Sequence, residues 1–343
     1  MNYFPIKLAY LSSGNIPSRF AHTIQIMRMS EELSQVVSKF CLITAIPEEK
    51  NKTSSKEIHD FYGTNDFPII FISNENNKYF INALNFLNQW KVDVVMTRCV
   101  IIAKYCLKQN LRVILETHIT HQDPFINKLK NLKKYSHLLS IITERSDLRS
   151  ILTREGTPRE IIKLLPQGIS NKKTPHLKKS ELRKKLGLPC DEFIILYSGH
   201  LFLRKGIDII LQTAEKLPKI RFYILGGTEE DIFFWKKCTQ YLNINFLGFE
   251  SPSKVHKYLQ ASDILLLTNN ANELDANVSS PLKLFEYIQA KRPIICSSTL
   301  YIKNFLSHEL EALIVPHTPK DFMEAIEKLK SSPQLRKELS DNA

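Results

Sequence analysis

The chain has 343 residues, 43% of them hydrophobic, which is enough for two domains that each bury a core of ordinary size. Six cysteines are dispersed without a C-x-x-C pair, which argues against a disulfide framework and a cysteine zinc site and fits a reducing cytoplasm. No apolar run approaches the roughly 18 residues of a membrane span, and the start does not read as a signal peptide. The net charge of +12 predicts attraction to polyanions, which include nucleic acids, anionic lipids and diphosphates.

The first half of the chain alternates short apolar runs with segments of helical spacing. A helix is expected from about Ala21 to Val37, and the stretch from Glu48 to Asn77 is polar and poorly patterned, so most of it is predicted to be a mobile excursion. Strands apolar on both faces indicate a parallel sheet covered by helices. The expected strands are 6–12, 40–45, 93–97, 112–117 and 138–143.

The second half shows the same alternation more clearly, and a basic linker precedes it. Residues 171–190 are polar and carry Pro175 and Pro189, which favours a linker followed by a short helix. The predicted domains are therefore 1–170 and 191–343, both α/β and doubly wound. The expected strands of the second are 192–198, 221–227, 244–248, 263–268, 292–297 and 311–315.

A lysine-bearing turn follows the first strand of the second half, in G-H-L-F-L-R-K-G. Gly199 permits close backbone approach, and Lys205 opens the next helix, where a lysine can neutralise a diphosphate. Arg204 could add a second cation. The alternative interpretation is a loop with exposed basic side chains.

Residues 280–286 read S-P-L-K-L-F-E and are typical of a helix start. Pro281 lacks the N–H that a first turn leaves unpaired, and Ser280 can cap that turn. The free amides of Leu282 and Lys283 then suit a phosphate, while Glu286 can accept hydrogen bonds from neighbouring hydroxyls. Phosphate with vicinal hydroxyls suggests a nucleotide. The alternative is an ordinary amphipathic helix with Glu286 in solvent.

Two further turns are candidates for the same crevice. Gly226 and Gly227 close one expected strand, and Gly248 and Phe249 close the next. In a Rossmann-like sheet these strand ends flank the ligand, where glycine lets a base lie against the backbone. Both can equally be plain turns.

In the first half, candidate residues also follow strands. His118, at a carboxyl edge, could hold sugar hydroxyls or orient an acceptor, although a structural role is equally compatible, and Glu116 is predicted as its helper. Arg19 follows the first strand on the acceptor side. The segment from Pro124 to Tyr135 mixes apolar residues with lysines, which fits either an anionic membrane surface or a solvated helix face.

Together these segments resemble glycosyltransferase family 4, the group 1 glycosyl transferases of the GT-B fold, over nearly the whole chain. The most specific segments are Y-S-G-H-L-F-L-R-K-G-I-D at 197–208, F-Y-I-L-G-G at 222–227, N-F-L-G at 245–248, A-S-D-I-L-L-L at 261–267 and S-P-L-K-L-F-E-Y-I-Q-A-K-R-P-I-I at 280–295. At the other end, I-P-S-R-F-A-H-T-I-Q-I-M-R-M-S resembles the first loop and acceptor-facing helix of the family.

The resemblance implies two Rossmann-like domains that face each other across a cleft. It also implies retaining transfer of a sugar from a UDP-, GDP- or ADP-sugar to a glycan or lipid-linked hydroxyl, in cell-surface glycan or glycolipid synthesis. No metal and no cofactor are expected beyond the nucleotide-sugar co-substrate, and the implied location is the cytoplasm or the inner face of the membrane. Lys205 would meet the phosphates, Glu286 the ribose and His118 the reacting sugar.

The chain departs from the family pattern at three places. Val278 replaces the first glutamate of the E-x7-E pair, which implies an altered contact to the donor sugar. His200 stands where many members have the arginine that pairs with the lysine, which implies that Arg204 compensates. The chain also ends at Ala343, before the expected helix that crosses back to the first domain.

Two rival functions stay open on the sequence alone. A nucleotide-sugar epimerase of the same fold would need no acceptor, and incubation with donor alone would reveal it. A basic nucleic-acid-binding or scaffold protein would bind oligonucleotides with a steep salt dependence, but no helix-turn-helix or RNA-binding signature is present. No nucleic-acid partner is therefore expected.

Overall fold

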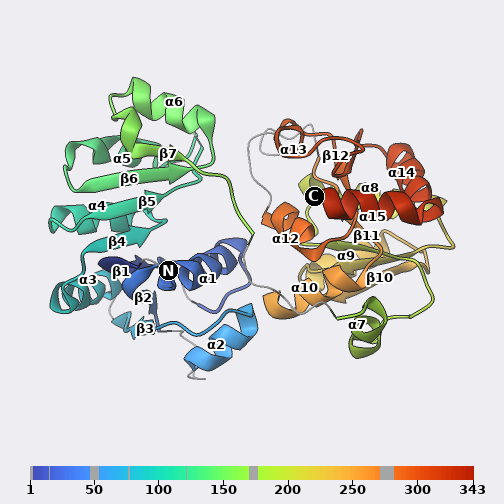
Figure 1. Cartoon of the computed structure of the whole chain (residues 1–343), viewed down its shortest axis with the longest axis horizontal. Coiled ribbons are helices and arrows are strands. Elements are labelled where there is room, and N and C mark those ends of the chain that lie inside the picture. The colour runs from blue at the N-terminus through green and yellow to red at the C-terminus, as the bar shows by residue number, and fades with distance from the viewer. Residues whose placement is uncertain are drawn as a thin grey trace. The chain divides into compact units, whose positions relative to one another are not determined.

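The computed structural model describes residues 3–14, 16–46, 54–75, 78–120, 122–169, 177–270 and 282–343. Contacts divide the chain into two compact units, Met1–Pro166 and Gln167–Ala343 (Figure 1). The short helix α7 (Lys179–Leu186), expected at the end of the linker, belongs to the second unit.

The first unit is built on a parallel sheet with the strand order β3-β2-β1-β4-β5-β6-β7. The order reverses between β1 and β4, and it is at such a reversal that doubly wound sheets bind ligands, beyond the carboxyl ends of the strands. The strands are β1 (Phe4–Leu11), β2 (Val37–Ala45), β3 (Ile69–Ile72), β4 (Val94–Thr97), β5 (Val113–Glu116), β6 (Leu138–Thr143) and β7 (Ile162–Leu164).

Helices cover both faces of this sheet, which explains why its strands are largely apolar on both sides. On one face, α1 (Ala21–Ser34) and α2 (Ser55–Tyr62) pack on alternate strand residues such as Leu8 and Leu42. The other face, with Ala9 and Cys41, carries the remaining helices. These are α3 (Tyr79–Trp90), α4 (Val100–Lys108), α5 (Ile126–Lys130) and α6 (Ser146–Arg154), with the 3₁₀ turns η2 (Asn131–Lys134) and η3 (Arg159–Ile161).

The expectation that residues 48–77 form an excursion was wrong for the part from Ser54 to Ile72. Ser54 and Glu57 form a capping box that starts α2, and Gly63 ends it with a positive φ. After α2 the chain adds β3, whose Ile69 pairs with Leu42 of β2. Residues 47–53, 76 and 77 lie outside the described part. An eight-residue helix and a four-residue edge strand leave too short a periodic pattern to be recognised in the sequence.

The second unit confirms the six strands expected from the sequence. Its parallel sheet has the order β10-β9-β8-β11-β12-β13, so the switch point lies between β8 and β11. The strands are β8 (Ile194–Ser198), β9 (Arg221–Leu225), β10 (Ile244–Gly248), β11 (Ile264–Leu267), β12 (Ile294–Ser297) and β13 (Leu313–Val315). Two doubly wound parallel sheets are the Rossmann-like domains predicted from the sequence.

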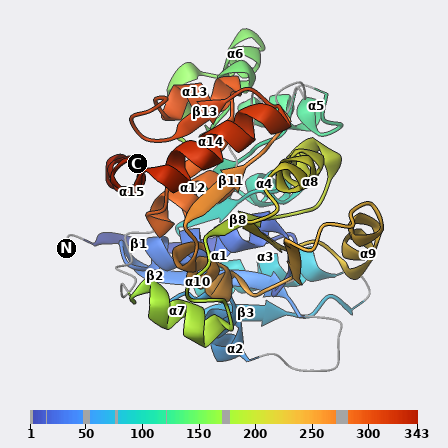
Figure 2. The same ribbon diagram turned by 90° about the vertical axis from the view of Figure 1, so that its right-hand side faces the viewer.

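Two sets of helices cover the second sheet, and Figure 2 shows α8 and α14 side by side on it. One set packs on the face that carries Ile195 and Phe222, and the other on the face that carries Leu196 and Leu265. The first set is α8 (Ile207–Lys216), α9 (Glu229–Lys237), α14 (Pro319–Ser331) and α15 (Pro333–Asn342). The second is α7, α10 (Pro252–Ala261), α12 (Leu282–Ala290) and α13 (Leu300–Phe305).

A basic residue of the predicted linker, Arg183, has a structural role. The buried Arg183 of α7 pairs with Asp263 at 2.6 Å and donates to the Ala261 carbonyl at 2.9 Å. Burial alone would raise the pKa of Asp263, but the Ile194 amide and the Lys179 and Arg183 charges outweigh it, and the pKa is lowered. These contacts fix α7 to the beginning of β11 and hold the carboxylate ionised.

Gly206 lies in a turn before α8 that packs closely against the end of β11, and substitution by alanine can test this contact. The φ of Gly206 is +72°, and a Cβ there would lie 1.8 Å from the Thr268 carbonyl oxygen. Gly187 has a similar φ of +66°, but no atom lies within 4 Å of the position that its Cβ would take. Gly187→Ala should cost only the left-handed backbone penalty of about 1–2 kcal/mol. Gly206→Ala should cost at least about 2 kcal/mol more, because the backbone of residue 268 must move.

Melting temperatures of the two variants against the wild type measure the difference. Equal losses at the two positions would contradict the close approach of the turn to the end of β11.

Candidate functional site

The turn after β8 runs from Gly199 to the 3₁₀ turn η4 (Leu203–Lys205), and hydrogen bonds tie it to the end of β11. The Thr268 hydroxyl donates to the Lys205 carbonyl at 2.8 Å, and the Asn270 amide donates to the Arg204 carbonyl at 3.1 Å. These bonds place Lys205 at the carboxyl edge of the sheet, beside the switch point. The predicted position of the lysine is therefore the one that a ligand of this fold would approach.

The glycines of neighbouring strand ends pack against this turn. A Cβ at Gly226 would lie 2.3 Å from the Gly199 carbonyl oxygen, and one at Gly227 would lie 2.5 Å from the Leu201 side chain. Close packing against neighbouring segments of the protein therefore explains why glycine is required at both positions. Gly248 ends β10 and accepts from the Gly226 amide at 2.7 Å, while Phe249 follows it half-buried. That these residues border a nucleotide base stays a prediction.

Helix α12 reaches the same edge and is fixed there by Tyr287. The buried Tyr287 hydroxyl accepts from the Ser198 amide of β8 at 3.0 Å and donates to the Leu266 carbonyl of β11 at 3.1 Å. One turn earlier, Lys283 places its Nζ 4.1 Å from the Tyr197 ring centroid. Glu286 lies on the same helix. Ser280 and Pro281, the predicted cap and first residue, lie outside the described residues.

Basic side chains gather at this edge. Burial and the Lys205 charge hold the pKa of Lys283 well below its usual range, against the opposing effect of Glu286. Burial, followed by the charges of Lys283 and Lys205, lowers the pKa of His200. Its ring stacks on Phe202 with centroids 5.1 Å apart, and the Arg204 guanidinium lies 4.7 Å from the same ring. Basic side chains gathered beside a helix N-terminus are an environment for an anion, whose charge would favour their protonated forms.

In the first unit, Glu116 at the end of β5 is the centre of a polar network. Its buried carboxylate accepts from Gln25 Nε2 at 2.8 Å, from His118 Nε2 at 2.9 Å and from the Tyr10 hydroxyl at 3.4 Å. Arg98 pairs with it at 3.9 Å and also donates to the Gln25 side-chain oxygen. The predicted pair of His118 and Glu116 is thus brought together, and Glu116 positions the ring.

His118 faces a carboxylate with each ring nitrogen. Nδ1 lies 3.3 Å from Glu144 Oε1, opposite the contact to Glu116. Burial alone would lower the pKa of His118, but the hydrogen bonds to the two glutamates more than offset it, and the pKa is raised. Burial would likewise raise the pKa of Glu116, yet His118 and Arg98 lower it overall. The two carboxylates favour the protonated ring, which donates from both nitrogens and is not placed to act as a base.

Sequence reasoning missed four members of this network. Tyr10, Gln25, Arg98 and Glu144 come from β1, α1 and the residues after β4 and β6. Arg98 and Glu144 each follow directly on an apolar strand, the same signal that identified His118. Arg19 lies exposed on the loop before α1, and other residues build the network around Glu116.

The lysines of residues 124–135 are largely engaged within the first unit. Lys130 pairs with Glu155 at 3.0 Å, Lys133 donates to the Glu155 carbonyl, and Lys128 lies 4.8 Å from the Phe125 ring centroid. Leu129 and Leu132 are buried in the core. These contacts favour the solvated helix face over membrane insertion, and contact with a membrane surface stays a prediction.

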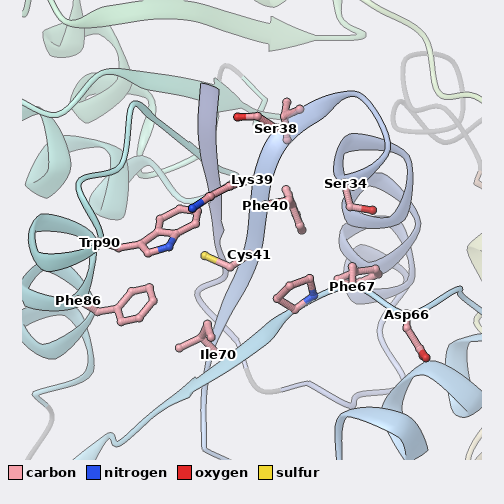
Figure 3. A pocket seen from close by; sticks show the side chains of 12 residues that line it. Ser34, Ser38, Lys39, Phe40, Cys41, Asp66, Phe67, Ile70, Phe86 and Trp90 are labelled. Carbon is pink, nitrogen blue, oxygen red and sulfur yellow. The ribbon is translucent and has the colours of Figure 1, made fainter. Parts of the chain in front are cut away.

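A cavity of about 450 Å³ lies elsewhere in the first unit, over the first residues of β2 (Figure 3). Phe86 and Trp90 of α3 line it together with Lys39 and Asp66. It includes none of the candidate residues and lies away from the carboxyl ends of the strands.

Among the described residues, no group of three or more His, Cys, Asp or Glu side chains could hold a metal ion. Within the same residues, every helix is too short or too polar to span a bilayer. The predicted metal independence stays a prediction.

Comparison with known proteins gives a match for the second unit. Residues 178–343 match the sequence model of the family Glycosyl transferases group 1. The alpha-galactosylglucosyldiacylglycerol synthase of Streptococcus pneumoniae is 28% identical over 202 residues, 56% of this chain and 52% of that protein. The putative teichuronic acid biosynthesis glycosyltransferase TuaC of Bacillus subtilis is 26% identical over 167 residues, 48% of this chain and 40% of that protein. The matches span about half the length of these curated relatives or less.

Solved structures show the same fold over nearly the whole chain. The Anabaena protein Alr3699/HepE in complex with UDP superposes with a TM-score of 0.72 at 13% identity, covering 98% of this chain and 93% of that one. Sucrose-phosphate synthase from Thermosynechococcus elongatus gives 0.70 at 17% identity, covering 98% and 92%. These likenesses confirm the predicted pair of Rossmann-like domains.

The charge on His118 predicts a pH-dependent stability. Because the pKa is raised by folding, the stabilisation is complete below the unfolded value of about 6.5 and is lost as the pH rises through the folded value. The difference in melting temperature between the wild type and His118→Gln should therefore shrink as the pH rises through this window. His137→Gln, in the same unit, is the control. A difference that is constant or grows with pH would contradict the imidazolium.

Proposed function

Because residues 178–343 match the model of the Glycosyl transferases group 1 family, we propose that the chain transfers a sugar from a nucleotide-sugar to a hydroxyl acceptor, with retention of configuration. The observation that carries the proposal is the cluster of Lys205, Lys283, His200 and Arg204 at the switch point of the second sheet. A diphosphate is the anion that such a cluster at the end of a Rossmann-like sheet can bind.

In the proposed donor site, Lys205 neutralises the diphosphate and the first amides of α12, at Leu282 and Lys283, bind its distal phosphate. Arg204 adds positive charge next to Phe202. Glu286 accepts hydrogen bonds from the ribose hydroxyls. The solved structures of Alr3699/HepE with UDP and with UDP-glucose support a nucleotide-sugar donor of this kind.

In the proposed acceptor site, His118 lies beside the reacting sugar or the acceptor and contributes positive charge there, because both of its N–H groups already bind Glu116 and Glu144. Glu116 and Glu144 keep the ring charged and oriented. The names of the S. pneumoniae and B. subtilis relatives support a glycolipid or a cell-surface glycan as the acceptor class. Action at the inner membrane face belongs to the same proposal.

In the proposed reaction, the bond between the anomeric carbon and the phosphate oxygen breaks as the acceptor oxygen attacks from the same face. The acceptor proton moves to the departing phosphate oxygen, so no separate general base is required. Negative charge accumulates on the diphosphate, beside Lys205 and the start of α12. Electrostatic stabilisation there contributes about 2.7–4 kcal/mol for each donor group, and no metal is required.

Lys205→Ala should lower turnover at least about a hundredfold while the fold stays intact, because the leaving group loses a positive charge. Turnover is measured by release of UDP, GDP or ADP from the corresponding sugars after a thermal-shift screen has identified the donor. Lys216→Ala, an exposed lysine on α8, is the control. Retained activity in the Lys205 variant would remove this residue from the mechanism.

Glu286→Ala should weaken binding of the nucleoside diphosphate, because the ribose loses its acceptor. The dissociation constant from calorimetry should rise about tenfold or more, which corresponds to the 1.5–3 kcal/mol of a hydrogen bond to a charged group. Glu324→Ala, on the exposed part of α14, should leave it unchanged. Unaltered affinity in the Glu286 variant would place the ribose elsewhere.

A further inference from the structure

Lys283 carries an ammonium group that the fold of the second unit does not explain. Its Nζ is buried, and within the part of the chain that the structure describes it makes no hydrogen bond. The Nζ atom lies over the Tyr197 ring, 4.1 Å from the ring centroid. A buried cation without hydrogen bonds is costly, and a ring face offsets only part of that cost.

The position of Nζ is close to the backbone of the lysine-bearing turn. A Cβ added at Gly199 would lie 2.7 Å from Nζ and 3.4 Å from the Tyr197 hydroxyl. The absence of a side chain at residue 199 therefore leaves room for the ammonium beneath the turn. Since Gly199 has a φ of +138°, the turn favours glycine for its backbone as well.

Neighbouring charges argue against a purely structural role. Lys205 repels the ammonium and Glu286 attracts it, and after burial these are the effects that set the lowered pKa of Lys283. The anchoring of α12 is carried by Tyr287, whose hydroxyl already joins β8 and β11. An apolar side chain at residue 283 would pack on Tyr197 without the desolvation cost, so the cation serves something other than folding.

We propose that the Lys283 ammonium is a direct ligand of the donor diphosphate, which it contacts from beneath the Gly199 turn while Lys205 contacts it from the turn itself. This inference rests on the proposed function and adds a side-chain role to a residue predicted to act through its amide alone. An ammonium has three donors, and none of them is used by a hydrogen bond among the described residues, so a small shift of the turn or of the side chain would offer them to phosphate oxygens. The helix start and the buried lysine then act on the same anion.

The test uses Lys283→Met, which removes the charge and keeps an unbranched chain of similar length, with Lys216→Met as the control. Inorganic pyrophosphate is the base-independent probe, and UDP-glucose is the second. Without ligand, Lys283→Met should melt at or above the wild-type temperature, because a buried cation is removed. Its affinity for pyrophosphate should fall at least tenfold, and the thermal shift seen with the wild type and Lys216→Met should be lost.

Lys283→Gln keeps a hydrogen-bond donor without the charge, and it shows whether the effect of methionine comes from altered packing. It should lose the same affinity for pyrophosphate. Wild-type affinity for pyrophosphate in either folded variant overturns the inference. A melting temperature well below that of the wild type in both variants also overturns it, since Lys283 would then be structural. If the wild type binds neither pyrophosphate nor any nucleotide-sugar, the proposed function itself fails.

Discussion

Positive charge held at the carboxyl ends of β8 and β11 is the constraint around which the second unit is arranged. Tyr287 joins the two strands through its hydroxyl and so sets the position of α12. Thr268 holds the carbonyl of Lys205, and Gly226 packs on Gly199, which fixes the turn. Each contact satisfies a buried polar group or closes a gap, and together they bring like charges near each other. Such an arrangement is stable when an anion is bound between them.

In the first unit, by contrast, the buried charges are paired with opposite charges. Around Glu116 and His118 each charge has a partner of opposite sign, so the network is ordered without a ligand. A hydrogen-bonded imidazolium held between two carboxylates presents a fixed orientation to whatever binds at the end of β5. The two units thus differ in their electrostatics: like charges lie close together in the second unit, and opposite charges are paired in the first.

The sequence predicted all the strands of the second sheet and the central strands of the first, and it missed the two edge strands of the first. Six strands of the second unit were recognised because they are continuously apolar and lie between helices. The edge strands β3 and β7 have four and three residues, and their pattern could not be distinguished from a loop. The predicted family resemblance was confirmed for residues 178–343, where the motifs were most specific.

By itself, the sequence determined which residues of the second unit are candidates for the chemistry, because Lys205 and Glu286 stand in segments whose local pattern also defines a turn and a helix. It also indicated that His118 follows a strand. Only the tertiary structure decided that Glu144, Arg98 and Gln25 meet at Glu116, and that the Lys283 ammonium is buried beside Gly199. The physical reason is that the hydrophobic periodicity of a segment indicates to what extent the segment is buried. Which side chains meet depends on strand order, and strand order is set by packing between residues far apart in the chain.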